Sequence, residues 1–293
     1  MNKEDRSSII AIVIVLLVAA GLALAGSQGG HKVSGFPVYA LCVALAFIIQ
    51  WIAFIPAWLN RTEKFYDLTG SITYITVTAT AVLLSPPADL RSWLLAGLIG
   101  VWAIRLGSFL FLRIRSAGED RRFREIKKSF FRFLMTWTLQ GLWVSFSLAA
   151  GLAAITSTLR LDLELFAVTG AIVWLTGFLI EVIADRQKSD FNAKPENKGK
   201  FIQSGLWSWS RHPNYFGEIV LWIGIAIIAL PILRGWQWVT LVSPIFVILL
   251  LTRISGIPML EKRADEKWGG QAEYEAYKAG TSVLIPTPPS KGK

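Results

Sequence analysis

Long apolar stretches alternate with short polar segments along most of the chain. Eight of them have about the twenty residues that an α-helix needs to cross a membrane. They lie at residues 8–25, 36–59, 69–85, 90–112, 131–155, 163–184, 214–233 and 236–254. The third is short and rich in threonine, so we expect it to face other helices rather than lipid. The pattern predicts an all-α, polytopic bundle of about eight transmembrane helices.

The first apolar stretch, residues 8–25, has the character of a secretory signal. However, no clear small-residue cleavage site follows it, and a second apolar stretch comes next. We therefore expect this segment to be retained as a membrane helix. The last residues, from Ile285 to Lys293, are rich in proline and lysine, and we expect them to form a frayed terminus.

The basic residues are distributed unevenly between the two sides of the predicted bundle. With the N-terminus in the cytoplasm, the inner segments hold 25 of the 30 Lys and Arg residues, and the outer loops hold 4. This bias is the one that the positive-inside rule describes, so we expect both termini in the cytoplasm. Anionic headgroups and cofactor phosphates account for the net charge of +10, and no nucleic-acid partner is predicted.

The composition excludes several other classes of protein. Only 17% of the residues are charged, whereas a soluble domain has about 25%. The single cysteine, Cys42, cannot form an intrachain disulfide, and His31 and His212 lie too far apart in sequence to suggest a zinc site. We therefore expect neither a soluble enzyme nor a metal site.

One polar segment, residues 181–218, stands out from the apolar background. Glu181 and Asp185 lie on one helical face, and Glu218 lies one turn inside the seventh apolar stretch. Ionisable groups inside a span are costly unless paired, so they indicate a functional site. Pro213 suits the first turn of a helix, whose free N–H groups attract anions. Charge-assisted bonds to phosphate are available from Arg186, Lys188, Lys200 and Arg211.

This segment predicts a site for an anionic or nucleotide-like cofactor at the cytoplasmic face. Simpler interpretations exist for each part of it. The basic loop can serve only to fix the topology. Glu218 can pair with Arg211 and do nothing more, and His212 can be bonded to the backbone.

A second polar group lies upstream, at the start of the third apolar stretch. Glu63, Lys64, Tyr66 and Asp67 are close together there, and Arg105 lies deep in the fourth stretch. Asp67 is suited to cap a helix or to interact with its dipole. Arg105 requires a carboxylate or a ligand anion, and we hypothesise that it pairs with Asp67 or Glu63.

Several motifs together are typical of one membrane protein family. They are Tyr66–Gly70, Arg105–Gly107, Gly118–Phe123, Asp185–Lys188, Gly256–Arg263, and the sequence Ser-Arg-His-Pro-Asn-Tyr-Phe-Gly-Glu at residues 210–218. From about residue 36 to the C-terminus, the chain resembles the bacterial family of steroid 5-alpha-reductase-like membrane proteins named for the domain of unknown function 1295.

The resemblance implies an NADPH-dependent reductase of an activated carbon–carbon double bond in a lipophilic, steroid- or isoprenoid-like enone. In the steroid reductases, a carboxylate and a tyrosine hold the enone oxygen, on which negative charge builds during hydride transfer. Asp67 stands at the carboxylate position and needs a raised pKa to donate a proton. Trp102 stands near the tyrosine position but has no acidic hydroxyl. Either Tyr66 or Tyr74 acts as the proton donor in place of that tyrosine, or the substrate is not a 3-oxo-steroid. Arg105 is the remaining member of this predicted catalytic group.

The resemblance also implies that the C-terminal helices hold the cofactor. The positions carried over are Asp185, Lys200, Arg211, His212, Asn214, Tyr215, Glu218, Trp222 and Arg253. The polar segment adds Glu181, Arg186, Lys188 and Asn192 to this group. Lys200 stands where the reductases have arginine, which weakens a bidentate grip on phosphate.

These expectations divide the chain into N-terminal transmembrane helices at residues 1–60 and a reductase-like catalytic domain at residues 61–293. The expected location is the bacterial inner membrane, with the cofactor site facing the cytoplasm. Apart from the cofactor, the expected partners are a lipophilic substrate and membrane lipid. The oligomeric state is left open.

Two alternative functions also fit the sequence. The pattern Arg211–His212–Pro213–x–Tyr215 with Gly217 also resembles membrane methyltransferases of the isoprenylcysteine and phospholipid type, which use S-adenosylmethionine. The extra basic residues at 186–200 favour NADPH, whose phosphates require more cations. A transporter or scaffold is the other alternative, because intramembrane acids also serve proton relays. The concentration of polar groups at one face argues against it.

Overall fold

The computed structural model describes residues 3–120 and 122–288, so Arg121 and the tail residues 289–293 lie outside the described residues. The chain forms two compact units. Unit 1 comprises Met1–Ala167 and Ile228–Ser243, and unit 2 comprises Val168–Ile227 and Pro244–Lys293. These units follow the packing of the chain. The division at residue 60 was drawn from expected function and stays a prediction.

Seven helical segments among the described residues are long and apolar enough to cross a membrane. They are Lys3–Gly26, Val38–Leu59, Leu90–Arg115, Phe130–Thr156, Leu165–Ala193, Pro213–Ile232 and Gly235–Trp268. The stretch at 69–85, expected as an eighth span, is the helix α3 (Tyr66–Leu83), whose five threonines keep it too polar for this group. The all-α, polytopic fold is confirmed, and the chain is an integral membrane protein.

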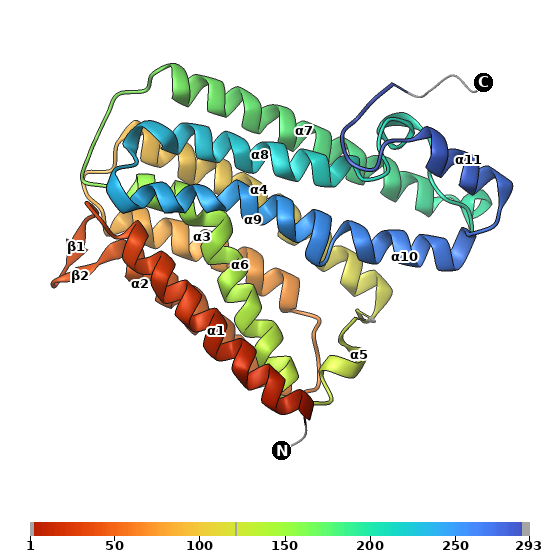
Figure 1. Cartoon of the computed structure of the whole chain (residues 1–293), viewed down its shortest axis with the longest axis horizontal. Coiled ribbons are helices and arrows are strands. Elements are labelled where there is room, and N and C mark those ends of the chain that lie inside the picture. The colour runs from red at the N-terminus through yellow and green to blue at the C-terminus, as the bar shows by residue number, and fades with distance from the viewer. Residues whose placement is uncertain (1–2, 121, 289–293) are drawn as a thin grey trace. The chain divides into compact units, whose positions relative to one another are not determined.

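Unit 1 is built around one buried helix. Its elements are α1 (Lys3–Gly26), β1 (Lys32–Val33), β2 (Phe36–Pro37), α2 (Val38–Leu59), α3, α4 (Leu90–Ala117), α5 (Phe123–Ile126), α6 (Phe130–Thr156), η3 (Leu230–Ile232) and η4 (Gly235–Leu241). The helix α6 packs against α1, α2 and α3, and its residues from Ser147 to Thr156 are all buried. Figure 1 shows α1 lying against α6. The other large contact of this unit joins α3 to α4.

Two arginines, buried Arg91 and half-buried Arg160, join the loops of unit 1. Arg91 is 1% exposed and donates hydrogen bonds to the carbonyl oxygens of Ile228, at 2.9 Å, and Asp162, at 2.8 Å. Arg160 donates to the carbonyl oxygen of Ser85 at 2.9 Å. A buried carbonyl group without a hydrogen bond is costly. Arg91 and Arg160 are two of the four basic residues in the predicted outer loops. Both therefore have structural partners.

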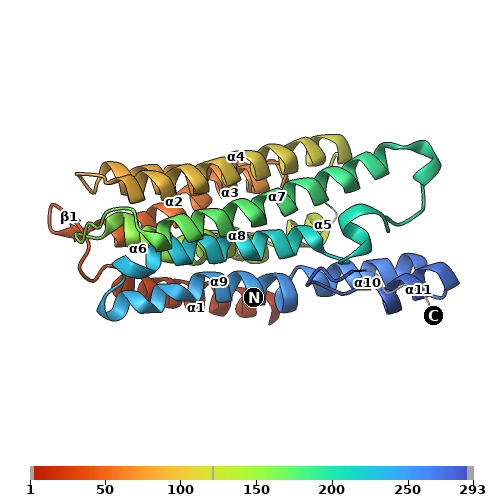
Figure 2. The ribbon, with the colours of Figure 1, turned by 90° about the horizontal axis from the view of Figure 1, so that it is seen from above.

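Unit 2 contains the remaining helices. They are α7 (Leu165–Ala193), η1 (Pro195–Asn197), η2 (Gly205–Ser208), α8 (Pro213–Ala229), α9 (Val242–Leu249), the π-helical turn η5 (Leu250–Ile254), α10 (Ile257–Trp268) and α11 (Ala272–Gly280). The helices α7 and α8 lie side by side in both ribbon views (Figures 1 and 2).

Glycines explain how closely α7 and α8 approach each other. A methyl group at Gly217 would lie 2.6 Å from the carbonyl oxygen of Gly177, and one at Gly224 would lie 2.6 Å from that of Gly170. The glycines of each helix are therefore two turns apart and face those of the other helix. Small residues allow such backbone contact between membrane helices. We call this contact the glycine seam.

Candidate functional site

The glycine seam brings the acids of α7 beside the start of α8. A methyl group at Gly217 would also lie 2.6 Å from the backbone nitrogen of Glu181, whose side chain is 2% exposed. One turn further along α7, buried Asp185 accepts a hydrogen bond from Nδ2 of Asn214 at 3.1 Å. Residues that are about thirty positions apart in sequence are therefore neighbours, as the polar segment predicted.

Two ionisable side chains immediately before α8, those of Arg211 and His212, form a compact cluster with a third from α10. Glu261, on α10, places one carboxylate oxygen 2.9 Å from Nη1 of Arg211 and the other 2.7 Å from Nε2 of His212. The ring of Tyr215 stacks on His212, with centroids 5.8 Å apart. Sequence reasoning offered Glu218 as the partner of Arg211 and did not select Glu261. The signal for Glu261 was its place in the family motif Gly256–Arg263.

The residues of this cluster suit a phosphate-bearing ligand. Nε of Arg211 is buried, yet it has no hydrogen-bond partner within residues 3–120 and 122–288. A buried donor without a partner costs about 1–3 kcal/mol, so a ligand acceptor would stabilise it. Lys188, whose Nζ lies 4.4 Å from the ring centroid of Trp207, acts electrostatically on His212 and adds positive charge there.

The C-terminal segment holds the backbone of this cluster in place. The N–H of Arg211 donates to the carbonyl of Ser282 at 2.8 Å, and Ser210 Oγ donates to that of Leu284 at 2.8 Å. The N–H of Thr287 donates to the carbonyl of Trp209 at 3.0 Å. The expectation of a frayed terminus was therefore wrong up to Thr287, because these hydrogen bonds fix the segment.

The remaining residues predicted to bind the cofactor divide by exposure. Trp222 is 1% exposed, and Glu218 is partly buried in the first turns of α8. Four others are exposed, namely Arg186, Asn192, Lys200 and Arg253. Arg186 is 83% exposed and lies 3.8 Å from Asp190 on its own helix. The roles of the buried and the exposed residues alike stay predictions.

His212 lies just before α8, outside the candidate spans. Burial lowers the pKa of its imidazole, although Glu261 acts in the opposite direction. Between its ordinary pKa of 6.5 and this lower value, folded protein binds fewer protons at His212 than unfolded protein does. The contribution of His212 to stability is therefore complete above pH 6.5 and is lost as the pH falls.

We expect the apparent Tm of the wild-type protein to fall more steeply between pH 7.5 and 5.0 than that of His212→Gln. The variant keeps an uncharged hydrogen-bonding group at this position but cannot be protonated. Thermal unfolding in detergent, with both proteins measured in the same buffers, checks this. Parallel curves for the two proteins would show that His212 does not control the acid sensitivity.

In unit 1, the second polar group is held by a buried carboxylate. Glu63 is 4% exposed and accepts hydrogen bonds from Nζ of Lys127 at 2.7 Å and from the N–H of Asp120 at 2.9 Å. Charged partners of this kind make the bond stronger than a neutral one. Glu63 therefore fixes the loop between α4 and α6 with Lys127 as a charged partner, and its pairing with Arg105 stays a hypothesis.

Asp67 lies in the first turn of α3, outside the seven candidate spans. Burial raises the pKa of its carboxyl group, and the guanidinium groups of Arg122 and Arg113 oppose this shift. The guanidinium carbon of Arg105 lies 5.4 Å from the ring centroid of Phe109, one turn further along α4. The pairing of Arg105 with Asp67 stays a hypothesis.

The structure separates the two tyrosines that sequence reasoning offered as proton donors. The hydroxyl of Tyr66 donates to the carbonyl of Thr136 at 3.0 Å, and its ring packs on Phe123 and Trp137. Tyr66 thus has a structural role in an aromatic cluster. Tyr74 is buried, and its ring packs edge-on against Trp102 with centroids 5.0 Å apart. A tyrosine from α3 therefore lies next to Trp102 of α4.

Comparison with known proteins gives distant relatives of two kinds. The chain is 28% identical over 118 residues to the 3-oxo-5-alpha-steroid 4-dehydrogenase 1 of Bos taurus. It is 29% identical over 121 residues to the steroid 5-alpha-reductase DET2 of Arabidopsis thaliana. Each alignment covers about 40% of both chains. A probable O-methyltransferase, ustE of Ustilaginoidea virens, is 34% identical over 62 residues, which is 21% of this chain and 22% of the relative.

The aligned region spans about 40% of the length of the curated steroid reductases. No solved structure matches the chain. Residues 53–281, which are most of the chain, match the family model described as protein of unknown function (DUF1295). This range includes the polar segment, Glu261 and the motif around Asp67. The chain therefore belongs to the DUF1295 family, whose resemblance to the steroid 5-alpha-reductases was expected from the sequence.

Proposed function

We propose that this protein is a membrane NADPH-dependent reductase that acts on an activated carbon–carbon double bond in a lipophilic enone. The observation that carries the proposal is the Arg211–His212–Glu261 cluster at the start of α8, with its buried Arg211 Nε available for an anion. The similarity to proteins named as steroid reductases supports the same reaction class.

In unit 2, the proposed roles follow from charge and hydrogen-bonding capacity. Arg211 contacts a phosphate of NADPH, and the N–H groups at the start of α8 contribute to the same anion site. Asp185, held by Asn214, accepts hydrogen bonds from ribose hydroxyls or the carboxamide. The glycine seam fixes these groups relative to one another. NADPH, when bound, supplies the hydride that the reaction requires.

In unit 1, we propose that Asp67 donates a proton or a hydrogen bond to the oxygen of the enone. Negative charge develops on this oxygen as the double bond is reduced, and an aimed donor in a dry site stabilises it. The raised pKa of Asp67 keeps its carboxyl group protonated to a higher pH than an exposed aspartate. Tyr74 is the proposed second donor, because it lies beside Trp102.

The reaction can be tested on purified protein with NADPH that carries deuterium at the transferable position. A panel of steroid, isoprenoid and fatty-acyl enones is incubated with the protein, and the products are analysed by mass spectrometry. The proposal predicts a saturated product that carries one deuterium from the cofactor, bound at the beta carbon. Exchange of substrate protons without formation of a saturated product from any enone of the panel would contradict it.

Replacing Arg211 by Gln is expected to weaken NADPH binding roughly tenfold to a hundredfold, because a hydrogen bond to a charged group contributes about 1.5–3 kcal/mol. Lys262→Gln is a matched control. It removes the same charge from α10, next to Glu261, but the Lys262 side chain is 79% exposed. Titration of both variants with NADPH measures the difference. Equal dissociation constants for the two would remove Arg211 from the phosphate site.

A methyltransferase that uses S-adenosylmethionine is the second candidate. The short alignment with the probable O-methyltransferase supports it, as does the Arg-His-Pro-x-Tyr pattern. Transfer of a methyl group from S-adenosylmethionine needs no phosphate-binding arginine and no proton donor to an enone. The Arg211 and Asp67 variants therefore also distinguish the two candidates.

We further propose that the protein resides in a bacterial inner membrane with the start of α8 and both termini facing the cytoplasm. The distribution of Lys and Arg supports this orientation. Single cysteines introduced at exposed Asn192 and at Lys32 in a Cys42→Ala background would report it. A membrane-impermeant thiol reagent applied to intact cells should label only the Lys32 position. Labelling of the Asn192 position alone would reverse the topology.

A further inference from the structure

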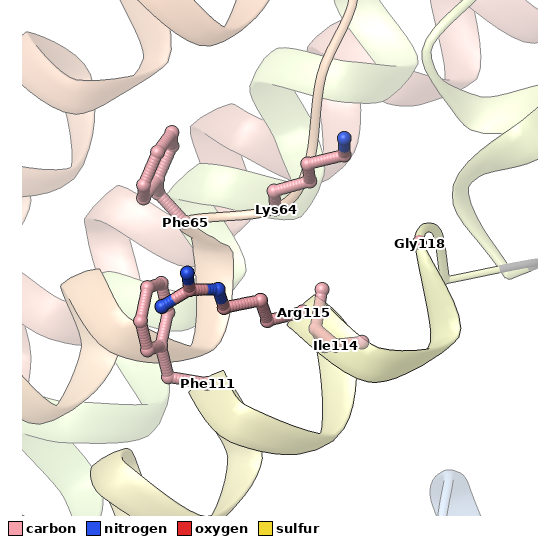
Figure 3. Close-up of a pocket in the computed structure, with 6 residues that line it drawn as sticks. All are labelled: Lys64, Phe65, Phe111, Ile114, Arg115 and Gly118. Carbon is pink, nitrogen blue, oxygen red and sulfur yellow. The ribbon is translucent and has the colours of Figure 1, made fainter.

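A small pocket lies in unit 1 between the start of α3 and the end of α4. It has a volume of about 180 Å³ and is lined by Lys64, Phe65, Phe111, Ile114, Arg115 and Gly118. Figure 3 shows these side chains, with Lys64 and Phe65 on one wall and Phe111, Ile114 and Arg115 on the other. The apolar stretch of α4 gives way to Arg113 and Arg115 near its C-terminal end, so the pocket lies where that stretch stops.

The walls of the pocket are aromatic and partly open. The rings of Phe65 and Phe111 stack, with centroids 6.4 Å apart and planes inclined by 24°. Phe65 is 56% exposed, Phe111 is half-buried and Ile114 is 7% exposed. An aromatic pair with one exposed ring at the end of an apolar stretch is suited to the boundary between lipid and water.

Two cationic side chains line the same pocket without a carboxylate partner. Neither Lys64 nor Arg115 forms an ion pair in the part of the chain that the structure describes. Nearby basic residues differ, because Arg122 pairs with Asp120, Arg124 with Glu119 and Lys127 with Glu63. The helix dipole favours Arg115 in the last turn of α4. It does not explain Lys64, which precedes α3.

The size of the pocket limits what can occupy it. Sites for drug-sized ligands have volumes of about 300–1,000 Å³, so 180 Å³ is small for a whole steroid-like molecule. A phosphate group with the adjoining glycerol carbons is a better match. It satisfies the two cations and places its apolar part against the aromatic rings.

We propose that this pocket binds the headgroup phosphate of an anionic membrane phospholipid. Lys64 and Arg115 contact the phosphate, and the Phe65–Phe111 pair packs against the glycerol and the first acyl carbons. The aromatic wall and the end of the α4 span favour a lipid over free phosphate. This site does not depend on the proposed reductase activity.

The test is binding of short-chain phosphatidylglycerol to the full-length protein in a neutral detergent, measured as a rise in apparent Tm. The double variant Lys64→Gln/Arg115→Gln should bind at least tenfold more weakly than wild type. The control, Arg124→Gln/Lys128→Gln, removes the same charge from exposed residues of the same unit and should bind like wild type. A Phe65→Ala variant should also bind more weakly.

Four outcomes would overturn the proposal. Equal binding by the pocket variant and its control would mean that charge alone attracts the lipid. An equal Tm rise with inorganic phosphate at the same concentration would make the pocket a phosphate site, and an equal rise with short-chain phosphatidylcholine would exclude selection of a net negative charge. Loss of NADPH binding in the pocket variant would assign the pocket to the nucleotide.

Discussion

Asp67→Asn is expected to lower the rate of enone reduction by roughly 10²- to 10⁴-fold, the range for loss of a general acid. Asparagine has nearly the same shape as aspartate, but its amide cannot transfer a proton. Three hydrogen bonds hold this region. Glu63 accepts two of them, from Lys127 and from the N–H of Asp120, and Tyr66 donates the third to the carbonyl of Thr136. None of the three involves the Asp67 carboxyl group. The variant should therefore fold and bind NADPH normally.

Single-turnover rates with saturating NADPH, together with the NADPH dissociation constant, check this prediction. Asp89→Asn is the matched control. Asp89 caps α4 through the N–H of Ser92 at 2.9 Å, and asparagine is an equally good capping residue. The control should keep its rate. Wild-type turnover in Asp67→Asn would show that another group, with Tyr74 the first to examine, protonates the enolate that hydride addition leaves.

Gly217→Ala is expected to destabilise the protein and to weaken NADPH binding. Alanine in place of glycine normally stabilises a helix by about 1 kcal/mol. Here the added methyl group would lie 2.6 Å from backbone atoms of Gly177 and Glu181, which cannot rotate away. The helices α7 and α8 must then separate. Overpacking of this kind costs about 1–3 kcal/mol.

Separation of these helices also moves Asn214 away from Asp185, so the apparent Tm and the NADPH affinity should fall together. Gly100→Ala in α4 is the control, because a methyl group there meets no atom within 4 Å. It should leave the apparent Tm unchanged or raise it. A Gly217→Ala protein as stable as the Gly100→Ala protein would mean that the glycine seam is not needed for stability.

The sequence predicted the membrane helices well because the bilayer imposes a length and an apolar composition on each. The one difference concerned α3, which was predicted as an eighth span and falls short of the apolar composition of the other seven. Its five threonines make it less apolar than the other spans, although it is helical and packs against α2, α4 and α6. Length and periodicity predict the helix, but the number of polar side chains that neighbouring helices cover depends on packing.

The candidate site was predicted less completely. Glu181, Asp185 and Asn214 could be grouped because helical periodicity and one loop connect them. Glu261 could not be assigned, because it follows His212 by 49 positions and meets it only through packing. The hydrogen bonds between the C-terminal segment and residues 209–211 depend on the same long-range packing, so composition alone suggested a frayed end.

The proposed function depends on NADPH binding by the cluster at the start of α8. The most direct test is the apparent Tm of the detergent-purified protein and of Arg211→Gln with NADPH, NADH or S-adenosylmethionine. A ligand at a hundred times its dissociation constant stabilises the folded state by about 2.7 kcal/mol. We expect NADPH to raise the Tm of the wild-type protein and to raise that of Arg211→Gln much less. A rise with S-adenosylmethionine alone, unaffected by the substitution, would show that this cluster does not bind NADPH.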